Sequence, residues 1–211
     1  MTAPALRALT ATDPSDRLQA ALSLGTHPDP AQIEELVARC GVEPDFYVRD
    51  MLTWALTRHP HDLVVPPVLA ELTSPVAQAR SQALHTLSKI GDPATWDHIT
   101  EDHLRDPDDQ VARTAWRAAV AVVPVGIEPE LARLLVTQLG RGDRDVQLSL
   151  SRALADLGDH ARRPLESIGA DDPETVHAHA IASLRALDDP EETFTVDVEE
   201  AKRVRALGDL A

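Results

Sequence analysis

The chain has 211 residues, of which 43% are hydrophobic and only 3% aromatic, so Ala, Leu and Val must build most of its core. Thirty-five acidic against 20 basic residues give a formal net charge of −15, and the only lysines are Lys89 and Lys202. Such a surface opposes the phosphate contacts on which nucleic-acid binding depends, so direct nucleic-acid binding is not expected.

Apolar residues recur with helical spacing through most of the chain, and prolines separate the helical segments. After a short leading helix at Pro4 to Leu9, the predicted helices span Ser15 to Leu24, Ala31 to Arg39, Asp45 to Arg58, Leu63 to Leu72, Val76 to Ile90, Ala94 to Leu104, Asp109 to Val123, Glu130 to Leu139, Asp143 to Leu157, Ala161 to Ile168 and Glu174 to Leu187. These helices form about six consecutive pairs.

The second helix of each pair repeats one short pattern. The equivalent positions are Arg17, Arg49, Arg80, Arg113, Gln147 and His177, separated by 32, 31, 33, 34 and 30 residues. A steady period in this range is typical of stacked-repeat solenoids. The sequence therefore predicts an all-α, right-handed α-α superhelix over residues 1–190.

A helical wheel places the core of each second helix one residue before the repeated position and three, six, seven and ten residues after it. In the second repeat these residues are Val48, Leu52, Ala55, Leu56 and His59, and in the fourth they are Ala112, Trp116, Ala119, Val120 and Val123. Positions one, five and eight after the repeated residue point away from that core. We expect them to form one continuous face across neighbouring repeats.

Residues 191–211 differ in kind from the repeats, because they follow an acidic run and end in a predicted helix from Glu199 to Leu207. One interpretation is a capping helix with an acidic outer face, and the alternative is an acidic tail that binds a partner.

The succession of a helix, an Asp-Pro-like turn and a helix that begins with Val-Arg resembles HEAT repeats, particularly the short bacterial type also called PBS-lyase-like. The resemblance covers roughly Ala3 to Leu187 and is clearest between Asp45 and Val123. It implies that the second helices line a concave surface and that turn acids and helix arginines form a ladder between repeats. The implied ladder consists of Arg17, Arg49, Arg80 and Arg113 with Asp13, Asp45, Asp106, Asp143 and Asp172. Gln147 and His177 depart from this pattern, and Ser74 replaces the acid of the third repeat.

Trp54 is the leading candidate for a contact residue, because it stands five residues after Arg49 and so on the predicted concave face. An exposed aromatic beside polar groups is what a peptide or small-ligand site needs. The predicted partner-binding residues are Trp54, His85, Asp50, Ser81, Lys89, Arg117 and Arg152. The alternative is that Trp54 packs over the seam between repeats.

Motifs that would indicate catalysis or metal binding do not occur in the sequence. There is no Gly-rich phosphate loop, nucleophile elbow or His-Glu-x-x-His run. The histidine pairs His59/His61 and His177/His179 have a spacing of two, which turns the rings to different faces of a helix. We predict no enzyme activity, no metal and no cofactor. HEAT-like DNA glycosylases rely on a basic groove, which this composition opposes.

The leading hypothesis is a non-catalytic scaffold whose concave groove binds a protein or peptide, with the acidic surface attracting a basic partner. The alternative is a ligand-sensing or regulatory module, because Phe46 to Ile90 is similar to HEAT segments of MerR-type regulators. A small-molecule ligand belongs to that alternative. A single cysteine, Cys40, and the lack of a long apolar stretch favour a cytoplasmic protein without a membrane span.

Overall fold

The computed structural model describes residues 2–189, and all regular secondary structure within that range is helical. Residues 191–211, for which a cap or a tail was predicted, lie outside the described residues. Tertiary contacts divide the chain into two compact units, Met1–Pro124 and Val125–Ala211. Each unit has its own helix pairs.

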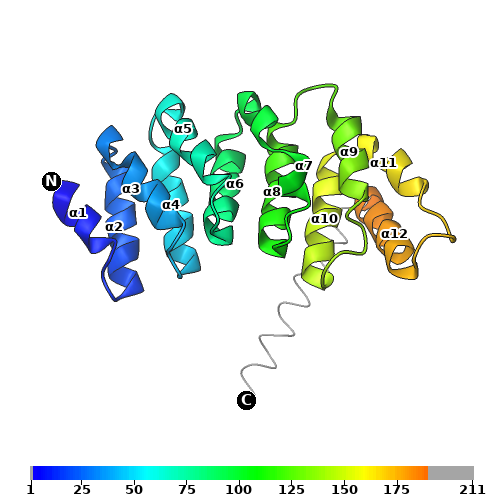
Figure 1. Ribbon diagram of the computed structural model, residues 1–211, viewed down its shortest axis with the longest axis horizontal. Coiled ribbons are helices and arrows are strands. Elements are labelled where there is room, and N and C mark those ends of the chain that lie inside the picture. Colours follow the sequence, from blue (N-terminus) through cyan, green and yellow to red (C-terminus); the bar gives the residue numbers. More distant parts are fainter. Residues whose placement is uncertain (1, 190–211) are drawn as a thin grey trace, which may run out of the picture. The chain divides into compact units, whose positions relative to one another are not determined.

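The first unit contains four helix pairs (Figure 1). Its elements are α1 (Thr2–Ala8), α2 (Pro14–Thr26), the 3-10 helix η1 (Pro30–Gln32), α3 (Ile33–Cys40), α4 (Phe46–Thr57), α5 (His61–Glu71), α6 (Ala77–Ile90), the 3-10 helix η2 (Pro93–His98), α7 (Glu101–Leu104) and α8 (Asp109–Val122). The second helices α2, α4, α6 and α8 pack in a row, each against the next. Among the first helices, α3 packs against α5.

The second unit contains two further pairs, α9 (Glu128–Val136) with α10 (Arg144–Asp156) and α11 (Asp159–Glu166) with α12 (Glu174–Asp188). Here too like helices are neighbours, since α9 contacts α11 and α10 contacts α12. Within residues 2–189 the all-α fold of consecutive helix pairs is therefore confirmed, with six pairs as predicted.

Aspartates fix the starts of four second helices. The side chains of Asp13, Asp45, Asp108 and Asp143 each accept a hydrogen bond from a backbone N–H of the first turn, at 2.8 to 3.0 Å. These N–H groups have no partner within the helix, and a carboxylate there also interacts favourably with the helix dipole. The aspartates therefore explain why these helix starts are readable from the sequence.

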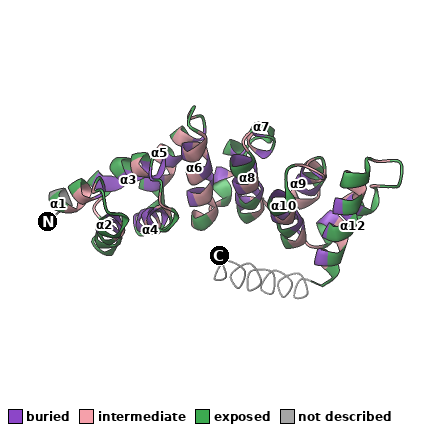
Figure 2. Ribbon diagram, turned by 90° about the horizontal axis from the view of Figure 1, so that it is seen from below, coloured by how far each residue is buried: buried purple, intermediate pink, exposed green. Residues whose placement is uncertain are grey.

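The core of α4 is the predicted one, because Val48, Leu52, Ala55, Leu56 and His59 are all buried. In α8 the prediction is only half right. Ala112, Trp116 and Ala119 are buried, but Val120 and Val123 are half-buried and Val122 is buried instead. The reason is that α8 packs against α6 on one side and against η2 and α7 on another, so its buried stripe is wider than a single face. Figure 2 shows buried and exposed residues along α8.

The continuous helix predicted from Ala94 to Leu104 is wrong. The segment forms η2 and the one-turn helix α7, separated at Ile99, whose backbone is extended. Thr100 begins α7 with a capping box, in which its backbone N–H donates to Nδ1 of His103 at 3.1 Å. His103 is in turn held by a 3.2 Å contact between its Nε2 and the carbonyl oxygen of Leu72, which is a tertiary contact that local periodicity does not reveal.

Candidate partner-binding groove

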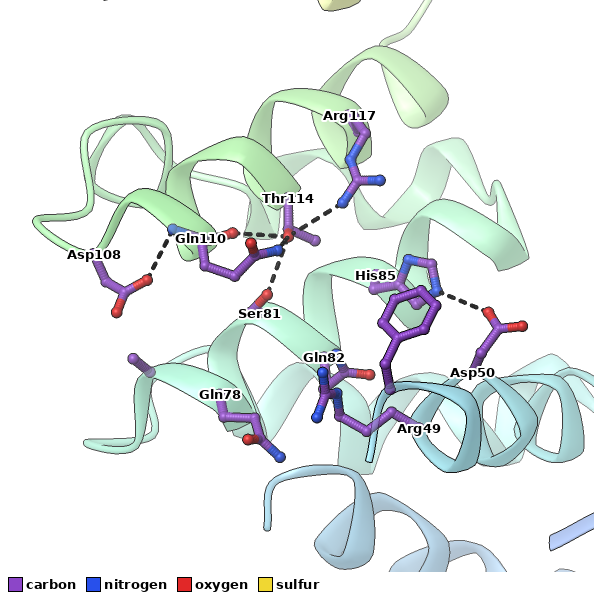
Figure 3. A pocket seen from close by; sticks show the side chains of 12 residues that line it. Arg49, Asp50, Gln78, Ser81, Gln82, His85, Asp108, Gln110, Thr114 and Arg117 are labelled. Carbon is purple, nitrogen blue, oxygen red and sulfur yellow. Dashed lines mark hydrogen bonds and ion pairs between the residues drawn. The ribbon is translucent and has the colours of Figure 1, made fainter. Parts of the chain in front are cut away.

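A groove of about 360 Å³ crosses the face of α4, α6 and α8 in the first unit (Figure 3). The groove residues come from these three second helices and the residue that caps α8. They are Phe46, Arg49, Asp50, Ala77, Gln78, Ser81, Gln82, His85, Asp108, Gln110, Thr114 and Arg117. Adjacent repeats thus contribute to one surface, as stacking predicts.

Four of the seven predicted contact residues line this groove, namely Asp50, Ser81, His85 and Arg117. Lys89 is exposed one helical turn beyond His85 and does not line it. Arg152 is exposed on α10 in the second unit. The structure therefore brings these four candidates together, while Lys89, Arg152 and Trp54 remain outside the lining.

Trp54 lies over the seam between α2 and α4. Its side chain is 37% exposed, and a Cβ added to Gly25 of α2 would lie only 2.3 Å from its Cζ3 atom. On the other side, the guanidinium carbon of Arg58 stands 6.0 Å from the indole centroid. This position agrees with the alternative interpretation, in which Trp54 packs over the boundary between two repeats.

Phe46 is the groove aromatic that the sequence reasoning missed. It is the first residue of α4 and is 66% exposed, with its ring in an edge-on contact with Tyr47 at 5.6 Å between centroids. The available signal was spacing, because Phe46 lies four residues before Asp50 and so on the same helix face. The equivalent positions in the next two repeats, Ala77 and Gln110, also line the groove.

Hydrogen bonds in the groove converge on Thr114. Its Oγ1 lies 3.0 Å from the hydroxyl of Ser81 and donates to the carbonyl oxygen of Gln110 at 2.8 Å. The same oxygen accepts from Nε2 of Gln110 and from Nη2 of Arg117, both at 3.4 Å. Ser81 and Thr114 are buried, so this network joins α6 to α8 beneath the groove.

Charges of both signs line the groove. Asp108 caps α8, and Nη1 of Arg49 donates to the backbone oxygens of Glu43 and Pro44 at 2.9 and 2.8 Å. Nε2 of His85 lies 3.8 Å from a carboxylate oxygen of Asp50, which is too far for a hydrogen bond. Desolvation, followed by the charges of Arg117 and Lys89, lowers the pKa of His85, so its ring is neutral at pH 7.

Two of the four predicted ladder arginines form ion pairs in the described structure. Arg80 donates to both carboxylate oxygens of Asp106, at 2.9 and 3.1 Å. Arg17 pairs with Glu43, which the sequence analysis did not single out, and not with a turn aspartate. Among the described residues, no carboxylate lies within 4.0 Å of a nitrogen of Arg49 or Arg113.

The other predicted ladder acids serve local turns. Asp13, Asp45 and Asp143 cap helices, as described above, and Asp172 accepts from the backbone N–H of Gly169 at 2.9 Å. An aspartate that caps its own helix holds its short side chain over the first turn. The longer side chain of Glu43 reaches the arginine of the preceding repeat.

Glu43 is the most heavily used acid of the first unit. Its side chain is fully buried and accepts hydrogen bonds from Arg17, Arg39 and the backbone N–H of Asp45. Burial by itself would raise the pKa of Glu43, but these hydrogen bonds outweigh it and lower the pKa to about 2. Its backbone oxygen also accepts from Arg49 and Gln78, so one residue connects three successive repeats.

Side chains that bind metals do not cluster in the described part of the chain. Between residues 2 and 189, no three His, Cys, Asp or Glu side chains are grouped in a way that would hold an ion. Across the same range, every helix is too short or too polar to cross a bilayer.

Comparison with known proteins gives one family. Residues 41–121 match the model of HEAT repeats, and no curated protein matches the chain. An engineered protein of the Northeast Structural Genomics Consortium has a TM-score of 0.47 and 20% identity, covering 91% of this chain and 97% of that one. A designed armadillo repeat protein has a TM-score of 0.45 and 17% identity over 89% of this chain and 100% of its own. A further designed armadillo repeat protein, in complex with the peptide (KR)4, has a TM-score of 0.45 and 15% identity, covering 87% of this chain and 98% of its own.

The matched segment begins just before α4 and ends within α8, so it contains the whole groove. Residues 41–121 of this chain are therefore HEAT repeats, and the groove is a surface of those repeats.

Proposed function

We propose that this HEAT-repeat scaffold is non-catalytic and binds an extended segment of another protein in the groove across α4, α6 and α8. The observation that supports this most is Phe46, a large aromatic side chain that is 66% exposed at the edge of a hollow lined by polar groups. Aromatic residues at such places supply much of the binding energy at protein interfaces.

The polar lining suits a peptide backbone. Oε1 of Gln82 is buried in the groove wall and has no hydrogen-bond partner within the described residues. A buried acceptor without a partner is costly, and rotation of the Gln82 amide toward the groove surface would let a backbone N–H of a bound segment satisfy it. The groove also runs over three helices in succession, which fits an extended chain better than a compact molecule.

The test is affinity capture from the native host with three single-alanine variants, read by quantitative mass spectrometry. Phe46→Ala is expected to remove a defined set of captured proteins, because it removes the exposed ring from the groove. Tyr47→Ala is the matched control, since Tyr47 is a neighbouring aromatic that is 71% exposed and does not line the groove.

Trp54→Ala tests the anchor predicted from the sequence against its seam position. Proteins that are lost with Phe46→Ala and kept with Tyr47→Ala support the groove. Equal capture by the wild type and Phe46→Ala would refute the proposal, provided that both chains give the same far-UV circular dichroism.

A further inference from the structure

Hydrogen-bond donors exceed acceptors at the α8 side of the groove. The hydroxyl of Ser81, the amide of Gln110 and the guanidinium of Arg117 all approach a single oxygen, Oγ1 of Thr114. A hydroxyl oxygen has only two lone pairs, and this one also donates its own hydrogen to a backbone carbonyl. The contacts from Gln110 and Arg117 are long, at 3.4 Å, so these donors retain most of their capacity for a better acceptor.

Arg117 also lacks a countercharge. Among the described residues no carboxylate lies within 4.0 Å of its nitrogens. By contrast, Arg80 on the neighbouring helix α6 is paired with Asp106. Desolvation in the groove and the charge of Arg113, one turn earlier on α8, both lower the pKa of Arg117. The cations around it thus repel one another, and an anion placed between them would be stabilised.

Neither carboxylate of the groove pairs with Arg117. Oδ1 of Asp108 accepts the backbone N–H groups of Gln110 and Val111 at 2.9 and 3.1 Å. Asp50 is 61% exposed on α4 and faces His85, not α8 (Figure 3). Lys89 adds a second positive charge near His85, beside that of Arg117. Near His85 the groove therefore has two positive charges, those of Arg117 and Lys89, against the one carboxylate of Asp50, in a chain whose net charge is −15.

We propose that Arg117 forms a carboxylate subsite that takes an Asp or Glu side chain of the bound protein segment. The guanidinium offers a planar pair of N–H donors that matches a carboxylate, with Gln110 able to donate beside it. This inference rests on the proposed function and specifies one chemical group that the groove binds, a carboxylate of the partner segment. The acidic surface as a whole still attracts a basic segment from a distance, and the subsite requires one acidic residue within that segment.

The test is selection from a random dodecapeptide library displayed on phage, because such a library offers acidic, basic and neutral residues alike. With the wild type, Asp or Glu should be enriched at one aligned position of the selected peptides. With Arg117→Gln that enrichment should disappear, and with Arg117→Glu the position should select Lys or Arg instead. Arg105→Gln is the matched control, since it removes one positive charge from an exposed side chain outside the groove.

A second measurement uses the strongest selected peptide, synthesised with a fluorescent label. Replacing its acidic residue by the corresponding amide should weaken binding to the wild type roughly tenfold in fluorescence anisotropy and leave binding to Arg117→Gln unchanged. Selected peptides that require Phe46 but carry no acidic preference, or a preference that survives Arg117→Gln, would overturn the subsite and leave the groove proposal standing. Selection of no peptide that depends on Phe46 would overturn both.

Discussion

Glu43 shows how much of the first unit depends on one buried charge. The side chain has no exposed surface and holds two guanidinium groups, of which that of Arg17 is itself buried. Neutralising the carboxylate would leave positive charge in a desolvated site. Removing one partner of a buried ion pair costs more stability than replacing the whole pair by apolar residues, because the remaining charge is buried without compensation.

We expect Glu43→Gln to lower the free energy of unfolding by on the order of 3 kcal/mol in urea denaturation at pH 7. The exposed pair Glu101 and Arg105, with a 3.0 Å contact, provides the control, and Glu101→Gln should change stability by about 0.5 kcal/mol or less. Similar losses for both variants would show that Glu43 has no special role.

The pH dependence of Glu43 follows from its pKa, which falls from 4.5 in the unfolded chain to about 2 in the folded one. The folded state then binds fewer protons than the unfolded state between these values. The stabilisation is complete above pH 4.5 and is lost as the pH falls toward 2.

The role of Glu43 could not be predicted from the sequence, because it lies in the turn between α3 and α4 and not at a repeated position. The repeat pattern singled out Arg17 and Arg80, which pair with Glu43 and Asp106 in the structure. It could not identify the acid that meets each of them, since that depends on side-chain length and on which aspartates are already used as caps.

The helices themselves were largely predictable. The starts of α4, α8 and α10 fall within one residue of the prediction, because an aspartate cap precedes each helix and apolar residues recur with a helical period. The break before α7 was not predictable, since it is stabilised by the contact of His103 with Leu72 in another helix pair. The face of α4 that forms the groove was predicted, but its exposed aromatic was placed at Trp54 and not at Phe46.

The packing of α2 against α4 depends on Gly25. An added Cβ would meet the Trp54 ring at 2.3 Å and the backbone Cα of Ala55 at 2.8 Å, and the backbone cannot move aside as a flexible side chain can. We therefore expect Gly25→Ala to destabilise the protein by about 1–3 kcal/mol, although alanine favours helix formation.

Thermal unfolding and tryptophan emission would both report this change. Gly169→Ala is the matched control, because nothing lies within 4 Å of a Cβ added there, and it should leave the melting temperature unchanged or slightly higher. An unaltered melting temperature for Gly25→Ala would mean that the two helices are less closely packed than the structure indicates.

We expect acid to destabilise the second unit through His179. In the second unit, Nδ1 of the buried His179 accepts the backbone N–H of Gly140 at 3.0 Å, while Nε2 lies 2.9 Å from the carbonyl oxygen of Gln147 and 3.1 Å from Ser151. Nε2 must therefore carry the proton, and a second proton on Nδ1 would face a donor. Desolvation lowers the pKa of His179 below its usual 6.5, against a smaller opposing effect of the Gln147 carbonyl.

Because the folded state binds fewer protons at His179, the contribution of His179 to stability is complete above pH 6.5 and is lost as the pH falls toward the lower folded-state pKa.

All three tryptophans lie in residues 1–124, so their fluorescence reports the first unit alone, whereas circular dichroism reports both units. We expect the urea transition followed by circular dichroism to gain an early phase between pH 7 and 5.5 that exceeds any change in fluorescence, because His85 of the first unit is less buried than His179 and Asp50 opposes the lowering of its pKa. In His179→Gln, which cannot titrate there, the early phase should already be present at pH 7 and should not grow on acidification. Curves from the two probes that superimpose at both pH values would contradict this prediction, because they would show the two units unfolding as one.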